Sequence, residues 1–248
     1  MRCHLQASRF LLLSAGATFT AAGFQAPPAN ATARQLFFTE KLDKDPKKKE
    51  PPAKPAIAPV VKPVAQPARY FGMRYSVLRV GPGGAETEVD PETSFRANDQ
   101  VRLELTSNQG GHLYVVHQGS RGDWDVLLPE PGQPAVILEA MRPAKIPEQV
   151  CFTFDKTPGV ERLFIVVSAA PEQDMEALIQ GVQARKGNPD KEVAQLAVEG
   201  MRDRLGTRNL RIEKVRPDDQ KRENAVYVVD ASENSSRVVF DIVLQHRE

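Results

Sequence analysis

Apolar and polar residues alternate in short runs from Tyr70 to the end of the chain. In residues 99–107, Val101, Leu103 and Leu105 alternate with charged or polar residues. Because successive side chains of a β-strand point to opposite faces, this alternation predicts a strand with one buried and one solvated face. Gly, Pro, Asn and Asp separate the runs, which is typical of a strand-rich domain.

The same pattern predicts about eight to ten strands. Residues 99–107 and 112–118 are separated by the short connection Asn-Gln-Gly-Gly, so we expect these two runs to pair as a hairpin. The connection 119–123 then leads into residues 124–128, and Pro129 ends that run. The expected strands lie at 70–80, 99–107, 112–118, 124–128, 136–138, 150–154, 163–168, 210–215, 225–229 and 237–245.

Two amphipathic helices interrupt the strand pattern between residues 172 and 205. Apolar residues recur there at the three- and four-residue spacing of one helical face, and Asn188-Pro189 suits the start of the second helix. The expected core-facing residues are Met175, Leu178, Ile179 and Val182, then Val193, Leu196, Ala197, Met201 and Leu205. We therefore predict a mainly β fold, a β-sandwich over residues 70–248 with an inserted helical pair.

The amino terminus has the pattern of a secretory signal peptide. Arg2 and Arg9 precede an apolar run at residues 10–24, which small residues and prolines follow. A membrane-spanning helix needs about 20 predominantly apolar residues, and this run is shorter and diluted by Ser, Thr and Gly. We expect residues 1–26 to be a signal peptide, with only transient membrane contact, and the protein to be extracytoplasmic, either periplasmic or secreted.

Residues 27–69 are expected to form a disordered Pro/Lys-rich linker. Residues 40–69 contain seven of the chain's 20 prolines, with lysines between them, and proline disfavours both helix and sheet. At ~3.1 Å per residue, an extended stretch of this length reaches on the order of 90 Å. Two interpretations stay open: a spacer that crosses part of a cell envelope, and a solvated tether.

The charge distribution argues against nucleic-acid binding. Residues 1–69 carry 11 Lys/Arg and 4 Asp/Glu, whereas residues 70–248 carry 22 and 28. Nucleic-acid binding needs clustered positive charge, so an acidic folded domain is a poor candidate. We expect no nucleic-acid partner.

Short blocks of the folded part occur in a fixed order. They are YFGMRYSVL at 70–78, FR at 95–96, DQVRL at 99–103, GHLYVV at 111–116, WDVLLP at 124–129, IP at 146–147 and PGVE at 158–161, with a tail at 209–246. This series resembles the bacterial family catalogued as domain of unknown function 4384, although His112 replaces an expected aromatic residue. The resemblance implies no catalytic residue. Because the family's domain also occurs beside kinase-like and protease-like modules, it suggests an accessory role.

The sequence shows no pattern of a catalytic, cofactor or metal site. It has no G-x-S-x-G elbow, no phosphate-binding loop and no H-E-x-x-H or C-x-x-C spacing. His117 with Asp123 or Asp125 allows two interpretations, a structural metal site and an exposed histidine beside two turn carboxylates. Loss of the signal peptide leaves Cys151 alone, and we expect this cysteine to be a buried, inert thiol.

Five residues are the candidate binding set: Tyr114, Arg121, Asp123, Trp124 and Asp125. Tyr114 and Trp124, with Phe152, are the aromatics best placed for a sugar- or peptide-binding face, although most aromatics of a small sandwich belong to the core. We expect an exported, non-enzymatic module that binds an envelope protein or polymer, with a sheet edge as a candidate contact surface. A hydrolase acting on envelope material and a structural envelope component are the alternatives.

Overall fold

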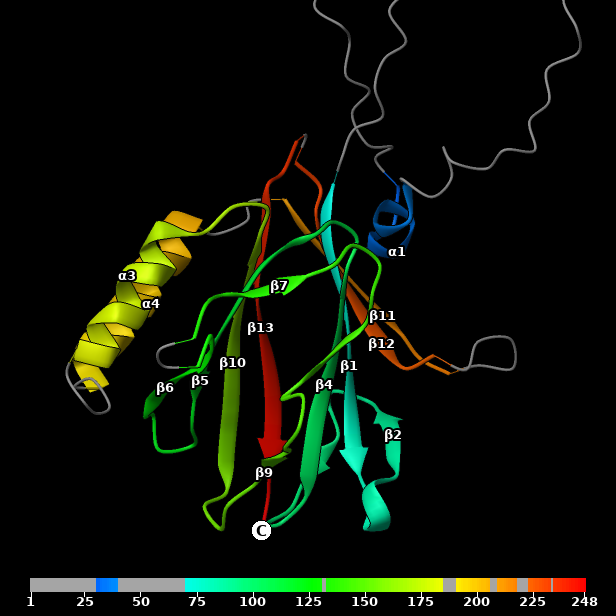
Figure 1. Cartoon of the computed structure of the whole chain (residues 1–248). Helices are drawn as coiled ribbons and strands as arrows, with labels where there is room; N and C mark the ends of the chain where they lie inside the picture. Colours follow the sequence, from blue (N-terminus) through cyan, green and yellow to red (C-terminus); the bar gives the residue numbers. More distant parts are fainter. Residues whose placement is uncertain are drawn as a thin grey trace, which may run out of the picture.

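The computed structural model describes residues 30–39, 70–130, 133–184, 191–205, 209–217, 223–232 and 234–248. Within these residues, 13 strands form two sheets that pack face to face, and a pair of helices lies outside one of them (Figure 1). The expected β-sandwich with an inserted helical pair is therefore confirmed. The expected signal peptide lies outside the described residues.

Sheet A has seven strands, all antiparallel to their neighbours. Its order is β11 (Leu210–Val215), β12 (Ala225–Asp230), β1 (Phe71–Val80), β4 (Gln100–Ser107) and β8 (Ala144–Ile146), with β2 (Glu86–Val89) beside β1 and β9 (Phe152–Thr153) beside β4. A short 3-10 helix, η1 (Pro82–Gly84), connects β1 to β2.

Sheet B has six strands in the order β3 (Ser94–Phe95), β13 (Arg237–His246), β10 (Gly159–Ser168), β5 (Gly111–Gln118) and β6 (Trp124–Leu128), with β7 (Val136–Leu138) beside β5. The pair of β13 and β3 is parallel, and the others are antiparallel. The short strands β2, β3 and β8 were not expected from the sequence, because two to four residues carry too little alternation to detect.

The main core lies between the two sheets. The inward residues of β4, Val101, Leu103 and Leu105, are completely buried, and the polar residues between them point outward. Side chains from β5, β10 and β13 meet them from sheet B. Burial of such apolar side chains is the dominant stabilising term of the sandwich.

Helices α3 (Gln173–Ala184) and α4 (Lys191–Leu205) cover the outer face of sheet B. Because both faces of the central strand β10 are buried, its sequence LFIVVS is apolar without alternation. Met175, Ile179 and Met201 are buried as expected, and Val198, which the sequence analysis did not place in the core, is buried beside them. The helical layer and the two sheets make three layers.

The predicted hairpin between residues 99–107 and 112–118 is wrong. Strand β4 pairs with β1 in sheet A, whereas β5 pairs with β10 in sheet B, so the connection at 108–110 crosses from one sheet to the other. The crossing brings Gly111 so close to β10 that a Cβ atom there would lie 2.6 Å from the carbonyl oxygen of Ser168. Alternation predicts which face of a strand is buried, but it does not identify the partner strand.

A short helix inside the expected linker packs on the outer face of sheet A. Helix α1 (Ala33–Phe37) begins with a capping box, in which Thr32 and Gln35 bind each other's backbone N–H groups. Leu36 and Phe37 are buried, and the Phe37 ring lies edge-on to Tyr227 of β12, with 5.3 Å between the ring centroids. Residues 30–39 therefore belong to the folded domain, and the expected boundary at residue 70 is wrong for them.

The two ends of the segment between α1 and β1 are held at one point. The buried Asn108 side-chain amide donates to the carbonyl oxygens of Phe37 (3.4 Å) and Tyr70 (2.7 Å), and its oxygen accepts from the N–H of Gly72 (2.8 Å). Residues 40–69 lie outside the described residues. The spacer and the solvated tether therefore stay predictions for that segment.

None of the helices in the described ranges is long and apolar enough to cross a membrane.

Candidate functional site

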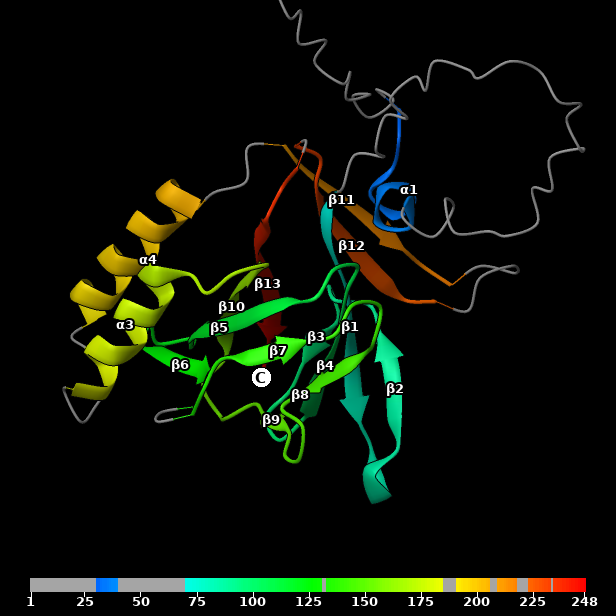
Figure 2. The same cartoon turned by 45° about the horizontal axis from the view of Figure 1, so that its top comes forward.

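Both sheets end on the same side of the sandwich, and a groove opens between their last strands. Strands β6 and β7 of sheet B lie on one side, and β8 with the segment leading to β9 lies on the other (Figure 2). Residues of both sides line the groove and form its two walls. The groove has a volume of about 980 Å³. That volume is at the upper end of the range found for small-molecule sites.

Prolines punctuate the strands that border this edge groove. Pro129 follows β6, Pro134 precedes β7, and Pro143 and Pro147 flank β8. The peptide bonds before Pro129 and Pro147 are cis. Within the described residues, no strand pairs with the second edge of β8. Because proline has no N–H, another chain could pair with these edges over only a few residues.

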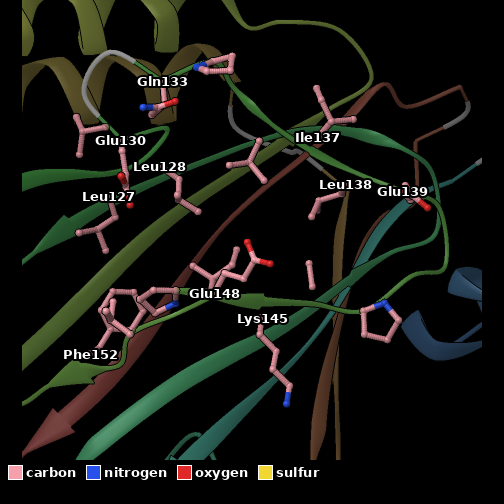
Figure 3. A pocket seen from close by; sticks show the side chains of 18 of the residues that line it. Leu127, Leu128, Glu130, Gln133, Ile137, Leu138, Glu139, Lys145, Glu148 and Phe152 are labelled. Carbon is pink, nitrogen blue, oxygen red and sulfur yellow. The ribbon is translucent and has the colours of Figure 1, made fainter.

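The lining of the edge groove is mostly apolar. Leu128 and Leu138 belong to one wall and Phe152 to the other, and Figure 3 shows how these side chains surround the opening. Two large apolar residues lie exposed around it: Ile137, whose exposed fraction is 60%, and Val150, at 64%. Exposed apolar side chains around a concave surface are typical of a surface that binds another molecule.

The charged residues of the edge groove divide into paired and unpaired groups. Arg142 forms an ion pair with Glu139 (2.8 Å between Nη1 and Oε1). Lys145 forms an ion pair with Glu86 of β2, and its side chain points away from the opening, whereas that of Glu148 points toward it (Figure 3). The pairing with Lys145, and less strongly with Arg102, holds the pKa of Glu86 below its ordinary value. Glu148 and Glu130 make no ion pair with another described residue.

Three of the five predicted binding residues line a second, smaller hollow of about 310 Å³ at the β5–β6 turn. They are Arg121, Asp123 and Asp125. The Arg121 guanidinium lies 3.9 Å from carboxylate oxygens of both Asp123 and Asp155, and it is largely exposed. Asp125 lies directly opposite His117 in the β5–β6 ladder.

Glu161 of β10 ties this turn to the neighbouring strand. Its carboxylate binds the Nε2 atom of His117 (2.7 Å) and accepts from the backbone N–H of Ser120 (3.2 Å). Burial acts to raise the pKa of Glu161, but these hydrogen bonds outweigh burial and lower it below its ordinary value of 4.5. Both carboxylate oxygens are thus used to hold the turn in place, which indicates a structural role.

Tyr114 and Trp124 do not reach a surface. Tyr114 is completely buried beneath α3, where its hydroxyl donates to Glu176 (2.8 Å) and accepts from the N–H of Glu172 (3.1 Å). Burial, followed by the hydrogen bond to Glu176, raises the pKa of Tyr114 to about 12. Trp124 is 4% exposed and packs with the same helix pair. The expected aromatic platform therefore does not form from these two residues, whereas Phe152, the third aromatic considered for it, lines the edge groove.

The structure brings together no metal-binding group in the part of the chain that it describes, since no three His, Cys, Asp or Glu side chains converge there. Cys151 is half-buried and lines the edge groove, so it is more accessible than the sequence suggested. Its neighbours Gln149 and Val150 offer their carbonyl oxygens to Arg102, which fixes the backbone of that wall.

Part of the chain matches a known family model. Residues 94–171 match the family model "Domain of unknown function (DUF4384)". The resemblance found in the sequence is confirmed over that range. No curated protein and no solved structure matches the chain. The DUF4384 match runs from β3 through β10 and so includes every strand that borders the edge groove.

No pattern in the sequence was interpreted as the edge groove. A signal was present in the spacing of the four prolines around the apolar runs at 126–128 and 136–138 and the short strand at 144–146. Such runs cannot be assigned to facing walls until the sheet order is known, because the walls come from different sheets.

Proposed function

We propose that this protein is an exported, non-enzymatic module that binds a segment of a partner protein in the edge groove. Export rests on the signal-like residues 1–26. The observation that carries the binding proposal is the groove itself: a large, mostly apolar hollow bordered by exposed Ile137 and Val150 and by short strand edges. Short free strand edges beside apolar pockets suit a bound polypeptide, which offers both backbone hydrogen bonds and side chains.

A protein segment fits these features better than a carbohydrate polymer does. Sugar-binding faces stack the rings of the ligand on exposed aromatic side chains, whereas Tyr114 and Trp124 are buried under the helix pair. The rim of the groove is aliphatic instead, with Ile137 on one wall and Val150 on the other.

The test uses two isoleucines of equal exposure. Ile137 lies at the rim of the edge groove, and Ile212 lies on β11 at the opposite edge of the sandwich; each is 60% exposed. A photo-crosslinking amino acid placed at residue 137 should form an adduct with a protein of the envelope, and the same group at residue 212 should not.

The adduct is then identified by mass spectrometry, and the purified partner is used to measure affinity. Ile137→Asp should weaken that affinity by about tenfold or more, because it places a charge on a contact that binding dehydrates. Ile212→Asp should leave the affinity unchanged. Equal loss in both variants, or no loss in either, would contradict the proposal. So would hydrolysis of envelope material by the purified protein if Ile137→Asp left that activity intact.

A further inference from the structure

The edge groove carries negative charge that the described residues leave unneutralised. Of its five charged lining residues, Arg142 is paired with Glu139, and Lys145 is turned away toward Glu86. The carboxylates of Glu130 and Glu148 remain, and both residues are exposed. Both basic residues of the lining are thus already matched within the fold, so the groove offers a ligand carboxylates and no free cation.

The position of Glu148 makes its charge relevant to a ligand. Its side chain points toward the opening from the end of β8, beyond Ile146 and Pro147, and the apolar Leu128 and Leu138 belong to the opposite wall (Figure 3). A carboxylate beside apolar surface interacts more strongly with a cation than one surrounded by water, because the local dielectric constant is lower.

The walls favour an extended ligand backbone. The free edge of β8 consists of three residues between Pro143 and Pro147, and β7 on the other wall is equally short. An extended segment can pair with such an edge over a few residues while its alternate side chains point into and out of the groove. A helix satisfies its own backbone groups and would make no use of the edge.

We propose that the edge groove binds an extended segment of a partner protein in which apolar residues alternate with lysine or arginine. The apolar side chains pack against Leu128, Leu138 and Phe152, and a basic side chain pairs with Glu148. This inference rests on the proposed function, since it names the chemistry of the segment that the groove receives.

The experiment measures the affinity of the purified protein for three short labelled peptides by fluorescence anisotropy. In each peptide valine occupies alternate positions, and the positions between hold lysine, serine or glutamate. The lysine peptide should bind most tightly and the glutamate peptide most weakly. The affinity for the lysine peptide should fall as salt is added, because the contact is between charges at an open site.

Two variants test whether the carboxylate of Glu148, and not a carboxylate elsewhere on the surface, sets the preference for the lysine peptide. Glu148→Gln keeps the shape of the side chain and should weaken binding of the lysine peptide by about two- to fivefold, the effect of losing one ion pair at an open site, with little change for the serine peptide. Asp203→Asn removes an exposed carboxylate on α4, away from the edge groove, and should change neither affinity. Matching thermal unfolding curves show that both variants are folded.

The outcomes distinguish this inference from the proposed function. If all three peptides bind equally well and Glu148→Gln has no effect, while Ile137→Asp still weakens binding, the groove is a protein-binding site and the cationic preference is wrong. If Ile137→Asp also has no effect, both proposals fail. Tighter binding of the lysine peptide after deletion of residues 51–68 would show that the chain's own Pro/Lys segment competes for the groove, which supports the cationic preference.

Discussion

Asn108 is a buried polar residue on which three segments of the chain depend. Its side chain is 5% exposed and binds backbone groups of Phe37, Tyr70 and Gly72. It also occupies the point at which the chain crosses from sheet A to sheet B. This buried amide stabilises the fold because its oxygen and nitrogen are both hydrogen-bonded. Its removal would take a hydrogen-bond partner from each of the three backbone groups.

Replacing Asn108 by alanine should lower the free energy of unfolding by about 2–4 kcal/mol, because one N–H and two carbonyl groups lose a partner in the interior. The measurement is urea unfolding followed by tryptophan fluorescence. Gln149→Ala is the control, since its exposed amide can be removed while its backbone carbonyl still accepts from Arg102. A loss in Asn108→Ala no larger than that in the control would show that water replaces the missing amide.

At the scale of elements, the pattern of apolar residues predicted individual strands well and their partners poorly. The strands at 100–107, 111–118 and 124–128 and the helical pair match the expected ranges, because alternation and helical spacing are local signals. The assignment of β4 and β5 to different sheets depends on the close approach of Gly111 to Ser168 and on the contacts of Asn108. Both are contacts between residues far apart in the sequence.

The candidate site residues show the same difference between local signals and contacts of distant residues. The turn residues Arg121, Asp123 and Asp125 do lie together, since neighbours in a tight turn must. Tyr114 and Trp124 do not join them, because the helix pair covers their face of sheet B, and strand alternation alone cannot show that both faces are buried.

Helix α1 is held on sheet A partly by charge, and its attachment should depend on pH. Glu223 contacts Arg34 of α1, Arg74 of β1 and Tyr227 of β12. Burial acts to raise the pKa of Glu223, but hydrogen bonds from Arg74 and Tyr227 and the charges of Arg74 and Arg34 lower it below its ordinary value of 4.5. A lowered pKa in the folded state means that this carboxylate stabilises the fold above pH 4.5 and that the contribution is lost as the pH falls through the lowered value.

Glu223→Gln should therefore lower the free energy of unfolding at pH 7 by about 1 kcal/mol, a modest value because the pair is partly solvated. The difference between the variant and the original protein should shrink as the pH falls below 4.5. Urea unfolding at pH 7 and at pH 3.5 measures it. A difference that stayed constant over this range would mean that Glu223 acts through packing rather than through its charge.

At the scale of the whole molecule, the residues that match the family model do not include all the strands with which they pair. Residues 94–171 contain β4 and β10 but neither β1, which pairs with β4 over eight residues, nor β13, which pairs with β10 over ten. The range also ends before the helix pair that covers sheet B. Its strands would expose backbone edges and apolar faces without these neighbours.

A fragment of residues 94–171 should therefore fail to fold by itself, whereas residues 30–248 should unfold cooperatively. Circular dichroism during thermal unfolding and limited proteolysis distinguish the two outcomes. A cooperative transition in the short fragment would show that β4 and β10 find other partners and that the contributions of β1 and β13 to the core are dispensable.

The convergence of Phe37 and Tyr70 on Asn108 has a consequence for proteolysis. A protease that cuts once within residues 40–69 would leave two polypeptides. The amino-terminal piece would stay bound to the domain through the Phe37–Tyr227 contact and the amide of Asn108, and its capping box would keep α1 helical. The nicked molecule would migrate as one particle under native conditions and as two bands after denaturation. A synthetic copy of residues 30–39, added to a chain that begins at Tyr70, should then restore the missing element by reassembly.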